Sequence, residues 1–260
     1  MIESSKENSL EREIKPADCV VILGRGIEQV ETKKGKEWKP TGAIERLTEK
    51  GWHSGIREKE LTPDAEGNVV IAGSNANVIA AVELFEELKK RKIPPKLIIF
   101  AAGRPAYLEQ EEDKTLTEGK ILSKKFTSEI KSEDKVEMTI LDKNKYTKDD
   151  IVESLRLSLD KGLHEITFIT ISLHKDRAEE FLKIVYSEHP ELRKVSGRFI
   201  ASEDLLSRRY SRSPSAMRLY TKHLEELKKS PAWKLTEARE KKGISDLRSG
   251  KYQTLQGPEK

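Results

Sequence analysis

The sequence predicts an α/β fold, namely a three-layer α/β/α Rossmann-like sandwich with a mostly parallel sheet. Short runs that are apolar throughout, such as DCVVIL (18–23) and KLIIFAAG (96–103), are typical of central strands that helices cover on both faces. Between such runs lie longer segments whose apolar residues recur at helical spacing. Strands that alternate with helices in this way favour a parallel sheet with right-handed crossovers.

Six strands are predicted from short runs rich in apolar and β-branched residues. Most of these runs are apolar on both faces, whereas KVEMTIL alternates and is expected nearer an edge of the sheet. The segment NVVIAGS is either a short strand or one arm of a hairpin. In chain order, the predicted strands are residues 18–23, 68–74, 96–103, 135–141, 166–172 and 195–201.

Five helices are predicted from apolar spacing and from the residues at their ends. Pro94 and Pro95 end the first helix, Gly162 ends the third, and the Ser213-Pro214 pair begins the last. The first predicted helix has its apolar residues at positions 78–88. In chain order, the other four are predicted over 115–126, over 149–161, in the segment that follows Ser172, and over 214–229.

The composition divides the chain into one domain with two appendages. Residues 1–16 are charged and end at a proline, which indicates a flexible lead-in to a domain over residues 17–229. Within this domain, residues 27–67 are polar and lack periodicity, so we expect an inserted lid or binding loop with one of its tryptophans as an apolar wall. Residues 230–260 are basic and are expected to form a tail with at most one short helix.

Charge and hydropathy limit the kind of protein. The 260 residues carry 49 basic and 45 acidic side chains, and this interleaving makes nucleic-acid binding an unfavoured function. No apolar stretch approaches the roughly 18 residues that a membrane helix needs, and the first residues lack the apolar segment of a signal peptide. The single cysteine, Cys19, excludes an internal disulfide. Together these features predict a cytoplasmic protein.

Four loops are expected to meet at one edge of the sheet. Right-handed crossovers bring the loops that follow parallel strands to the same edge, so residues 24–26, 103–104, 142–150 and 172–177 should converge. Ligands of open α/β sheets bind beyond the carboxyl ends of the strands. This edge is therefore the predicted site.

The residue types at this edge favour an anionic small molecule as the partner. Glycine amides, arginines and a helix N-terminus all bind phosphate or carboxylate groups. His174 and Asp149 could share proton transfer and are the candidate catalytic residues. Turn formation, helix capping and surface ion pairs are the structural alternatives for each residue. The candidate ligand-binding residues are Gly24, Arg25, Gly26, Gly103, Arg104, Thr147 and Arg177.

Several common motifs are absent from the sequence. The Gly24-Arg25-Gly26 turn is not a dinucleotide fingerprint, because Gln29 stands at the third glycine position. Neither a G-x-x-x-x-G-K-[ST] loop nor a G-x-S-x-G nucleophile turn occurs. The five histidines show no zinc-ligand spacing, so no metal site is predicted.

The order of the motifs resembles the bacterial YdcF-like family, a family of unknown function that includes SanA-like and ElyC-like envelope proteins. DCVVILGRG (18–26) and IIFAAGRP (98–105) are similar to its two glycine-terminated strands. TISLHKDRA (170–178) is similar to its Thr-Ser-x-x-His-x-x-Arg-Ala signature, the most specific of the motifs. KYTKDDI (145–151) is similar to its Ser-x-Asn-Thr-x-Glu-Asn motif, although two asparagines are replaced.

The resemblance covers roughly residues 17–205 and implies a Rossmann-like sandwich. A Glu-Ala pair of the family corresponds in part to Glu118-Gly119, which adds Glu118 to the ligand-binding residues. The resemblance also implies a nucleotide-like ligand, with S-adenosylmethionine as a candidate cofactor, or a role in envelope integrity or lipid-carrier metabolism.

The sequence leaves the function open between two classes. One is an enzyme, such as a transferase or hydrolase, that acts on a nucleotide-like or phosphorylated molecule. The other is a non-catalytic ligand-binding or regulatory module. Replacing His174 distinguishes them, because an enzyme would lose turnover and keep binding, whereas a module would lose only affinity.

Overall fold

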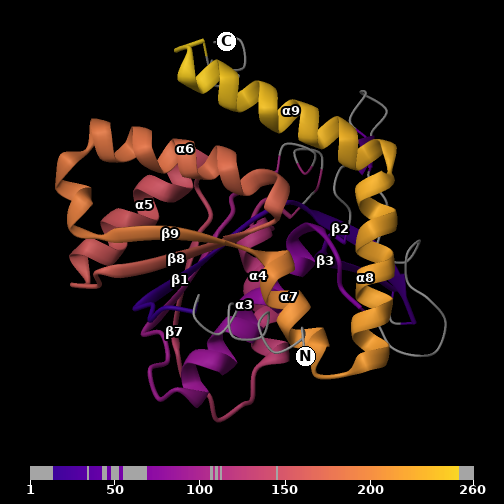
Figure 1. Cartoon of the computed structure of the whole chain (residues 1–260). Helices are drawn as coiled ribbons and strands as arrows, with labels where there is room; N and C mark the ends of the chain where they lie inside the picture. The colour runs from indigo at the N-terminus through magenta and orange to yellow at the C-terminus, as the bar shows by residue number, and fades with distance from the viewer. Residues whose placement is uncertain are drawn as a thin grey trace, which may run out of the picture.

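The computed structural model describes residues 14–33, 35–42, 69–105, 108, 111, 113–144 and 146–251, together with the backbone of 46–47 and 53–54. Five parallel strands form one sheet with helices on both faces (Figure 1). The predicted three-layer α/β/α Rossmann-like fold is therefore confirmed.

The sheet has its first strand at the centre. In sheet order the strands are β7 (Glu137–Leu141), β6 (Leu97–Ala101), β1 (Cys19–Leu23), β8 (Glu165–Thr170) and β9 (Ser196–Ala201). On β1, Val20 and Ile22 enter one hydrophobic cluster, whereas Val21 and Leu23 enter the other. Both faces of β1 are buried, which explains why its sequence is apolar throughout.

The helices divide between the two faces of the sheet, and this division fixes the position of the site. One face is covered by α3 (Gly73–Lys90), α4 (Glu118–Glu129) and α7 (Ser202–Ser211). The other is covered by α5 (Thr147–Asp160) and α6 (Ser172–Glu188). The chain moves outward from β1 to β6 and β7, and then returns to β8 and β9 on the other side. The direction of winding therefore reverses between β1 and β8, where open α/β sheets bind ligands.

The segment expected as a short strand or hairpin arm forms no strand in the described part of the chain. Residues 69–72 are buried, and α3 begins directly after them at Gly73, whose φ of +69° is open to glycine. The amide of Val70 donates to the hydroxyl of Tyr210 on α7 at 2.8 Å instead of to a strand. A short apolar run does not by itself distinguish a strand from a buried connection.

Part of the expected insertion forms β-structure. Strands β2 (Ile27–Thr32) and β3 (Gly35–Pro40) form an antiparallel hairpin that packs against α4, and a short pair joins β4 (Arg46–Leu47) to β5 (His53–Ser54). Trp38 on β3 is half-buried. Trp52 and most of the predicted lid lie outside the described residues.

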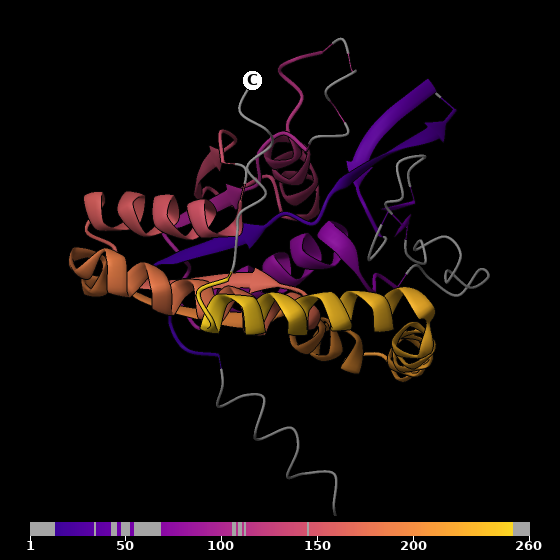
Figure 2. The ribbon, with the colours of Figure 1, turned by 90° about the horizontal axis from the view of Figure 1, so that it is seen from above.

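The C-terminal segment contains more structure than the sequence predicted. After the 3₁₀ turn η2 (Pro190–Lys194), β9 and α7, helix α8 (Pro214–Lys229) begins at its Ser213 cap, as expected. The expected tail then forms α9 (Pro231–Arg248), a helix of 18 residues that packs along α6 (Figures 1 and 2). Within the described ranges, none of the helices is both long and apolar enough to span a membrane.

The pattern of α9 explains why the sequence did not predict its packing. Its buried residues are Trp233, Thr236, Glu240 and Gly243. They recur every three or four positions, as one face of a helix requires. Because only the tryptophan is a large apolar residue, this face does not stand out as an apolar stripe.

Candidate functional site at the carboxyl edge of the sheet

The loops that follow the central strands meet at the carboxyl edge. A Cβ atom added to Gly103 would lie 1.9 Å from the carbonyl oxygen of Asn144, so the loop after β6 touches the loop after β7. The Oγ1 atom of Thr147 lies 3.2 Å from Nε2 of His174, which joins the starts of α5 and α6. These contacts bring together residues that are far apart in the sequence, as the predicted topology requires.

The glycine turn after β1 forms hydrogen bonds with side chains of the protein itself, including a carboxyl group. The amide of Gly26 donates to Oε1 of Glu118 at 2.6 Å, and the amide of Arg25 donates to Oγ of Ser74 at 2.5 Å. The Ser74 hydroxyl donates to the same carboxyl oxygen at 2.5 Å. A Cβ atom on Gly24 would lie 2.6 Å from Cδ of Glu118, so only glycine permits this approach. The amide of Gly24 donates to the carbonyl oxygen of Ala101 at 3.2 Å. The glycine amides predicted to face a ligand therefore have internal partners.

A second buried carboxyl group lies at the start of α6. Glu203 of α7 accepts hydrogen bonds from the amide and the hydroxyl of Ser172, at 2.8 and 2.9 Å. One of the helix N–H groups expected to be free is thus satisfied. Burial raises the pKa of both Glu203 and Glu118, although hydrogen bonds to each carboxyl group act in the opposite direction. Burial therefore favours the neutral form of both groups.

His174 lies at the centre of a hydrogen-bonded cluster beneath α9. Its side chain is almost completely buried, and its Nδ1 atom lies 3.2 Å from Oε2 of Glu240. Burial lowers the pKa of His174 to about 4, against the effect of the hydrogen bond to Glu240, so the ring is neutral at pH 7. Nδ1 faces both oxygens of the Glu240 carboxylate, which can only accept, and also Nη2 of Arg177 at 3.3 Å, which can only donate. We assign the proton to Nδ1 because the hydrogen bond to a carboxylate is charge-assisted, and the approach of Arg177 is then not a hydrogen bond. Nε2 then accepts from the hydroxyl of Thr147.

Glu240 joins this histidine to two arginines. Its Oε2 atom lies 2.8 Å from Nε of Arg177, and its Oε1 atom lies 3.9 Å from Nη1 of Arg25. Burial raises the pKa of Glu240, but the hydrogen bond to His174 and the charges of Arg25 and Arg177 outweigh it and lower that pKa overall. Arg25 follows β1, and the other two basic residues follow β8. The cluster therefore lies where the winding of the sheet reverses.

Two predicted site residues lie apart from this cluster. The guanidinium group of Arg104 donates to three backbone carbonyls within residues 108–116, so it organises its own loop. Asp149 is exposed and lines a groove beside α5. Among the described residues, the hydrogen-bond partners of His174 include Thr147 but not Asp149.

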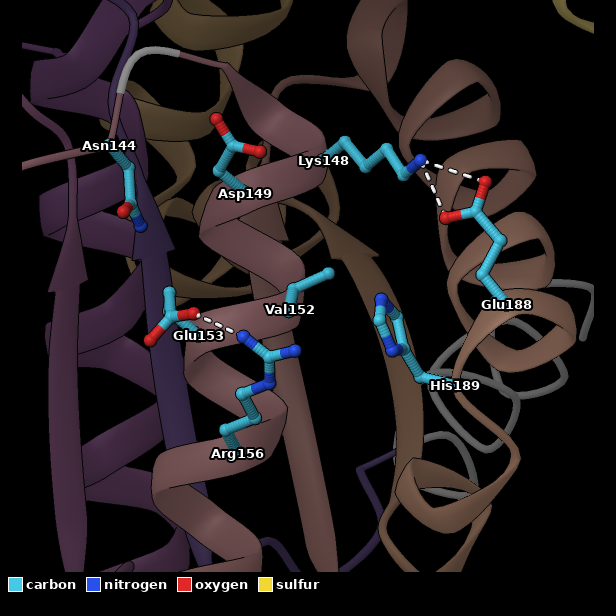
Figure 3. Close-up of a pocket in the computed structure, with 8 residues that line it drawn as sticks. All are labelled: Asn144, Lys148, Asp149, Val152, Glu153, Arg156, Glu188 and His189. Atoms are coloured by element: carbon cyan, nitrogen blue, oxygen red, sulfur yellow. Dashed lines mark hydrogen bonds and ion pairs between the residues drawn. The ribbon is translucent and has the colours of Figure 1, made fainter.

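The groove that contains Asp149 is polar and is lined by paired charges (Figure 3). Lys148 forms an ion pair with Glu188 at 2.6 Å, and Arg156 forms one with Glu153 at 2.9 Å. The full lining consists of Asn144, Lys148, Asp149, Val152, Glu153, Arg156, Glu188 and His189. Neither His174 nor the two arginines at Glu240 belong to this groove.

Asp150, and not the predicted Asp149, is the acid that faces the interior of the protein. Asp150 accepts a hydrogen bond from Nδ2 of Asn144 at 3.2 Å. Burial raises the pKa of Asp150 to about 7, and the charges of Glu118 and Asp149 add to this effect, while the hydrogen bond from Asn144 opposes it. Adjacent positions on a helix point about 100° apart, so the two acids have different surroundings.

Neither a metal site nor a known relative was found. In the described part of the chain, no group of three or more His, Cys, Asp or Glu side chains could hold a metal ion. Comparisons of the chain with protein-family models, with curated proteins and with solved structures gave no match. The resemblance to the YdcF-like family therefore stays a prediction that depends on the motifs.

Proposed function

We propose that the protein binds an anionic small molecule, phosphorylated or nucleotide-like, at the carboxyl edge between β1 and β8. The observation that carries this proposal is the convergence of Arg25, His174 and Arg177 on one carboxylate at that edge. Guanidinium groups bind phosphate and carboxylate groups through planar pairs of N–H donors. The reversal of winding is also where ligands of such sheets bind.

The chemistry of the cluster favours phosphate over the other candidates. A phosphate group offers several oxygens to the two guanidinium groups, whereas S-adenosylmethionine could offer only its carboxylate. S-adenosylmethionine therefore stays a candidate only through the YdcF-like resemblance. A cytoplasmic location, and an envelope or lipid-carrier role, likewise stay predictions from the sequence.

An enzyme and a binding module differ in what His174 does. Its neutral ring accepts a hydrogen bond from the hydroxyl of Thr147 through Nε2, so it could accept a proton from a substrate hydroxyl or water at that position. This contact favours a transferase or hydrolase. A non-catalytic module is the second candidate, because the same ring could serve only to orient Glu240.

Calorimetry on the full chain tests the proposal. ADP, a sugar phosphate, S-adenosylmethionine and inorganic pyrophosphate would be titrated separately. A phosphorylated compound should bind, and at a hundredfold excess over its dissociation constant it should stabilise the fold by about 2.7 kcal/mol. Absence of binding by every compound would contradict the proposal.

The variant His174→Ala then separates the two candidate functions. Catalysis predicts that turnover of the bound compound is lost while affinity is kept. A binding module predicts reduced affinity and no turnover in the wild type. Thermal melting of the variant checks that its fold is intact.

A further inference from the structure

We infer that Glu240 occupies the position of the phosphate group of the ligand, so that α9 closes the site and moves away when the ligand binds. This inference rests on the proposed function and adds to it the subsite, the competing internal group and the moving element. It is carried by the contacts of Glu240, by the face that α9 turns to the cluster, and by the place where α9 is anchored.

The first support is the position of the Glu240 carboxylate. It is 6% exposed and lies among Arg25, His174 and Arg177, so an anion from the C-terminal helix already fills the predicted anion site. Burial of a carboxylate is unfavourable unless basic groups pair with it. One carboxylate reaches Arg177 at 2.8 Å but Arg25 only at 3.9 Å. A tetrahedral phosphate, with more oxygens, could contact both arginines closely.

The second support is the shape and polarity of α9 where it covers the cluster. A Cβ atom on Gly243 would lie 2.9 Å from Cδ of Arg177, so the helix approaches this arginine closely because it has no side chain there. The neighbouring buried positions, Thr236 and Glu240, are polar. This part of the contact therefore depends on ion pairs and hydrogen bonds, for which a ligand anion can compete.

The third support is the way in which α9 is attached on either side of the site. At its first turn, Trp233 is 8% exposed and belongs to the large hydrophobic cluster, and the Ser230 hydroxyl accepts from its amide at 3.1 Å. The polar contact through Glu240 lies two turns further along the helix. Apolar burial thus holds the first turn of α9, and near its other end Leu247 packs against the second hydrophobic cluster while Arg248 pairs with Glu180. The segment above the site, between these two ends, is held by charge pairing through Glu240.

The test compares binding of inorganic pyrophosphate to full-length variants by calorimetry. Glu240→Gln keeps the shape of the side chain but removes the competing charge, and it should bind pyrophosphate about tenfold more tightly than the wild type. Glu237→Gln removes the same charge from the same helix, where it pairs with Lys241, and should bind like the wild type.

Amide hydrogen exchange of the wild type supplies a second measurement. Addition of pyrophosphate should increase exchange along residues 236–248 of α9 and leave exchange along α8 unchanged. This readout does not require a variant to fold. Circular dichroism melting of each variant confirms that the sheet is intact before binding is compared.

The outcomes separate this inference from the proposed function. Binding of pyrophosphate by wild type and Glu240→Gln with equal affinity, or weaker binding by the variant, overturns the inference and leaves the proposed function in place. Absence of binding of both pyrophosphate and ADP by every variant overturns both. Tighter binding by Glu240→Gln, together with faster exchange in α9, supports the inference.

Discussion

The Nδ1 atom of His174 lies 3.2 Å from Oε2 of Glu240, although 66 positions separate the two residues in the chain. Both side chains are buried. This hydrogen bond connects the first turn of α6, which follows the inner strand β8, to the C-terminal helix. The protonation of a core histidine is consequently coupled to the placement of α9.

The pKa of His174 provides a direct test of this coupling. The folded-state pKa of about 4 lies below the ordinary histidine value of about 6.5, so between these values the folded protein binds fewer protons than the unfolded chain. The free energy of unfolding should therefore fall as pH is lowered from 7 to 5. Urea denaturation of the wild type and of His174→Gln at pH 7 and pH 5 measures this fall in the free energy of unfolding. An equal fall in both proteins would contradict the lowered pKa of His174.

The raised pKa of Asp150 predicts that the free energy of unfolding depends on pH in the opposite direction. Its folded-state pKa of about 7 lies above the ordinary aspartate value of about 3.9, so its contribution to stability decreases as pH rises through that interval. Asp150→Asn removes this penalty. The variant should be more stable than the wild type at pH 8 by a few kcal/mol, with a smaller difference at pH 4.

The exposed neighbour Asp149 provides the matched control for that experiment. Asp149→Asn removes the same charge from the same helical turn, but its side chain lies in the groove of Figure 3. Chemical denaturation should show that this variant keeps most of the pH dependence of the wild type, because burial is the largest cause of the raised pKa of Asp150 and the charge of Asp149 is a smaller one. A gain at pH 8 as large as that of Asp150→Asn would show that loss of charge from the helix, and not burial, is the cause.

An ion-pair cluster between α3 and α7 should be sensitive to the loss of one arginine. Glu83 is 1% exposed, and Arg212 donates to both of its carboxyl oxygens. Among the described residues, Arg212→Ala leaves this buried carboxylate with the more distant Arg209, at 3.9 Å, and should reduce the free energy of unfolding by about 3 kcal/mol. Adding Glu83→Gln should recover part of that loss. The exposed Arg218→Ala should change it by less than about 0.5 kcal/mol.

Gly103 should tolerate no side chain. The Cβ atom of Gly103→Ala would overlap the carbonyl oxygen of Asn144, a backbone atom that cannot move by rotation of a side chain. The variant should lose about 1–3 kcal/mol of unfolding free energy in guanidinium denaturation. The exposed position Lys131, in the loop after α4, serves as the control. A Gly103→Ala protein as stable as Lys131→Ala would show that the two loops do not meet as described.

The parallel sheet could be predicted because its strands are buried on both faces. Runs such as 18–23 and 96–103 are apolar without interruption, and their loops must converge once the crossovers are right-handed. The segment 68–74 was wrongly expected to form a strand or hairpin arm, because buried residues in an irregular connection have the same composition as those of a strand. Helix α7 was not predicted at all.

The candidate site could be predicted only in part, because its contacts depend on long-range packing. The sequence indicated His174 and Arg177 through their place after a buried strand. It did not indicate Glu240, which is one of many charged residues in a segment without an apolar stripe. Similarly, which of Asp149 and Asp150 faces the interior depends on how α5 is rotated against the sheet. The sequence does not reveal this rotation, because the two adjacent residues are identical.

The central position of β1 has a consequence for synthesis of the chain. Cys19 of β1 pairs with Leu97 of β6 on one side and with Ile166 of β8 on the other. During synthesis, β1 therefore lacks its second neighbouring strand until more than half of the chain has been made. Such non-local pairing slows folding and leaves an apolar strand edge open meanwhile. A ribosome-bound chain that ends before residue 166 should therefore depend on chaperones, whereas one that extends past β9 should not.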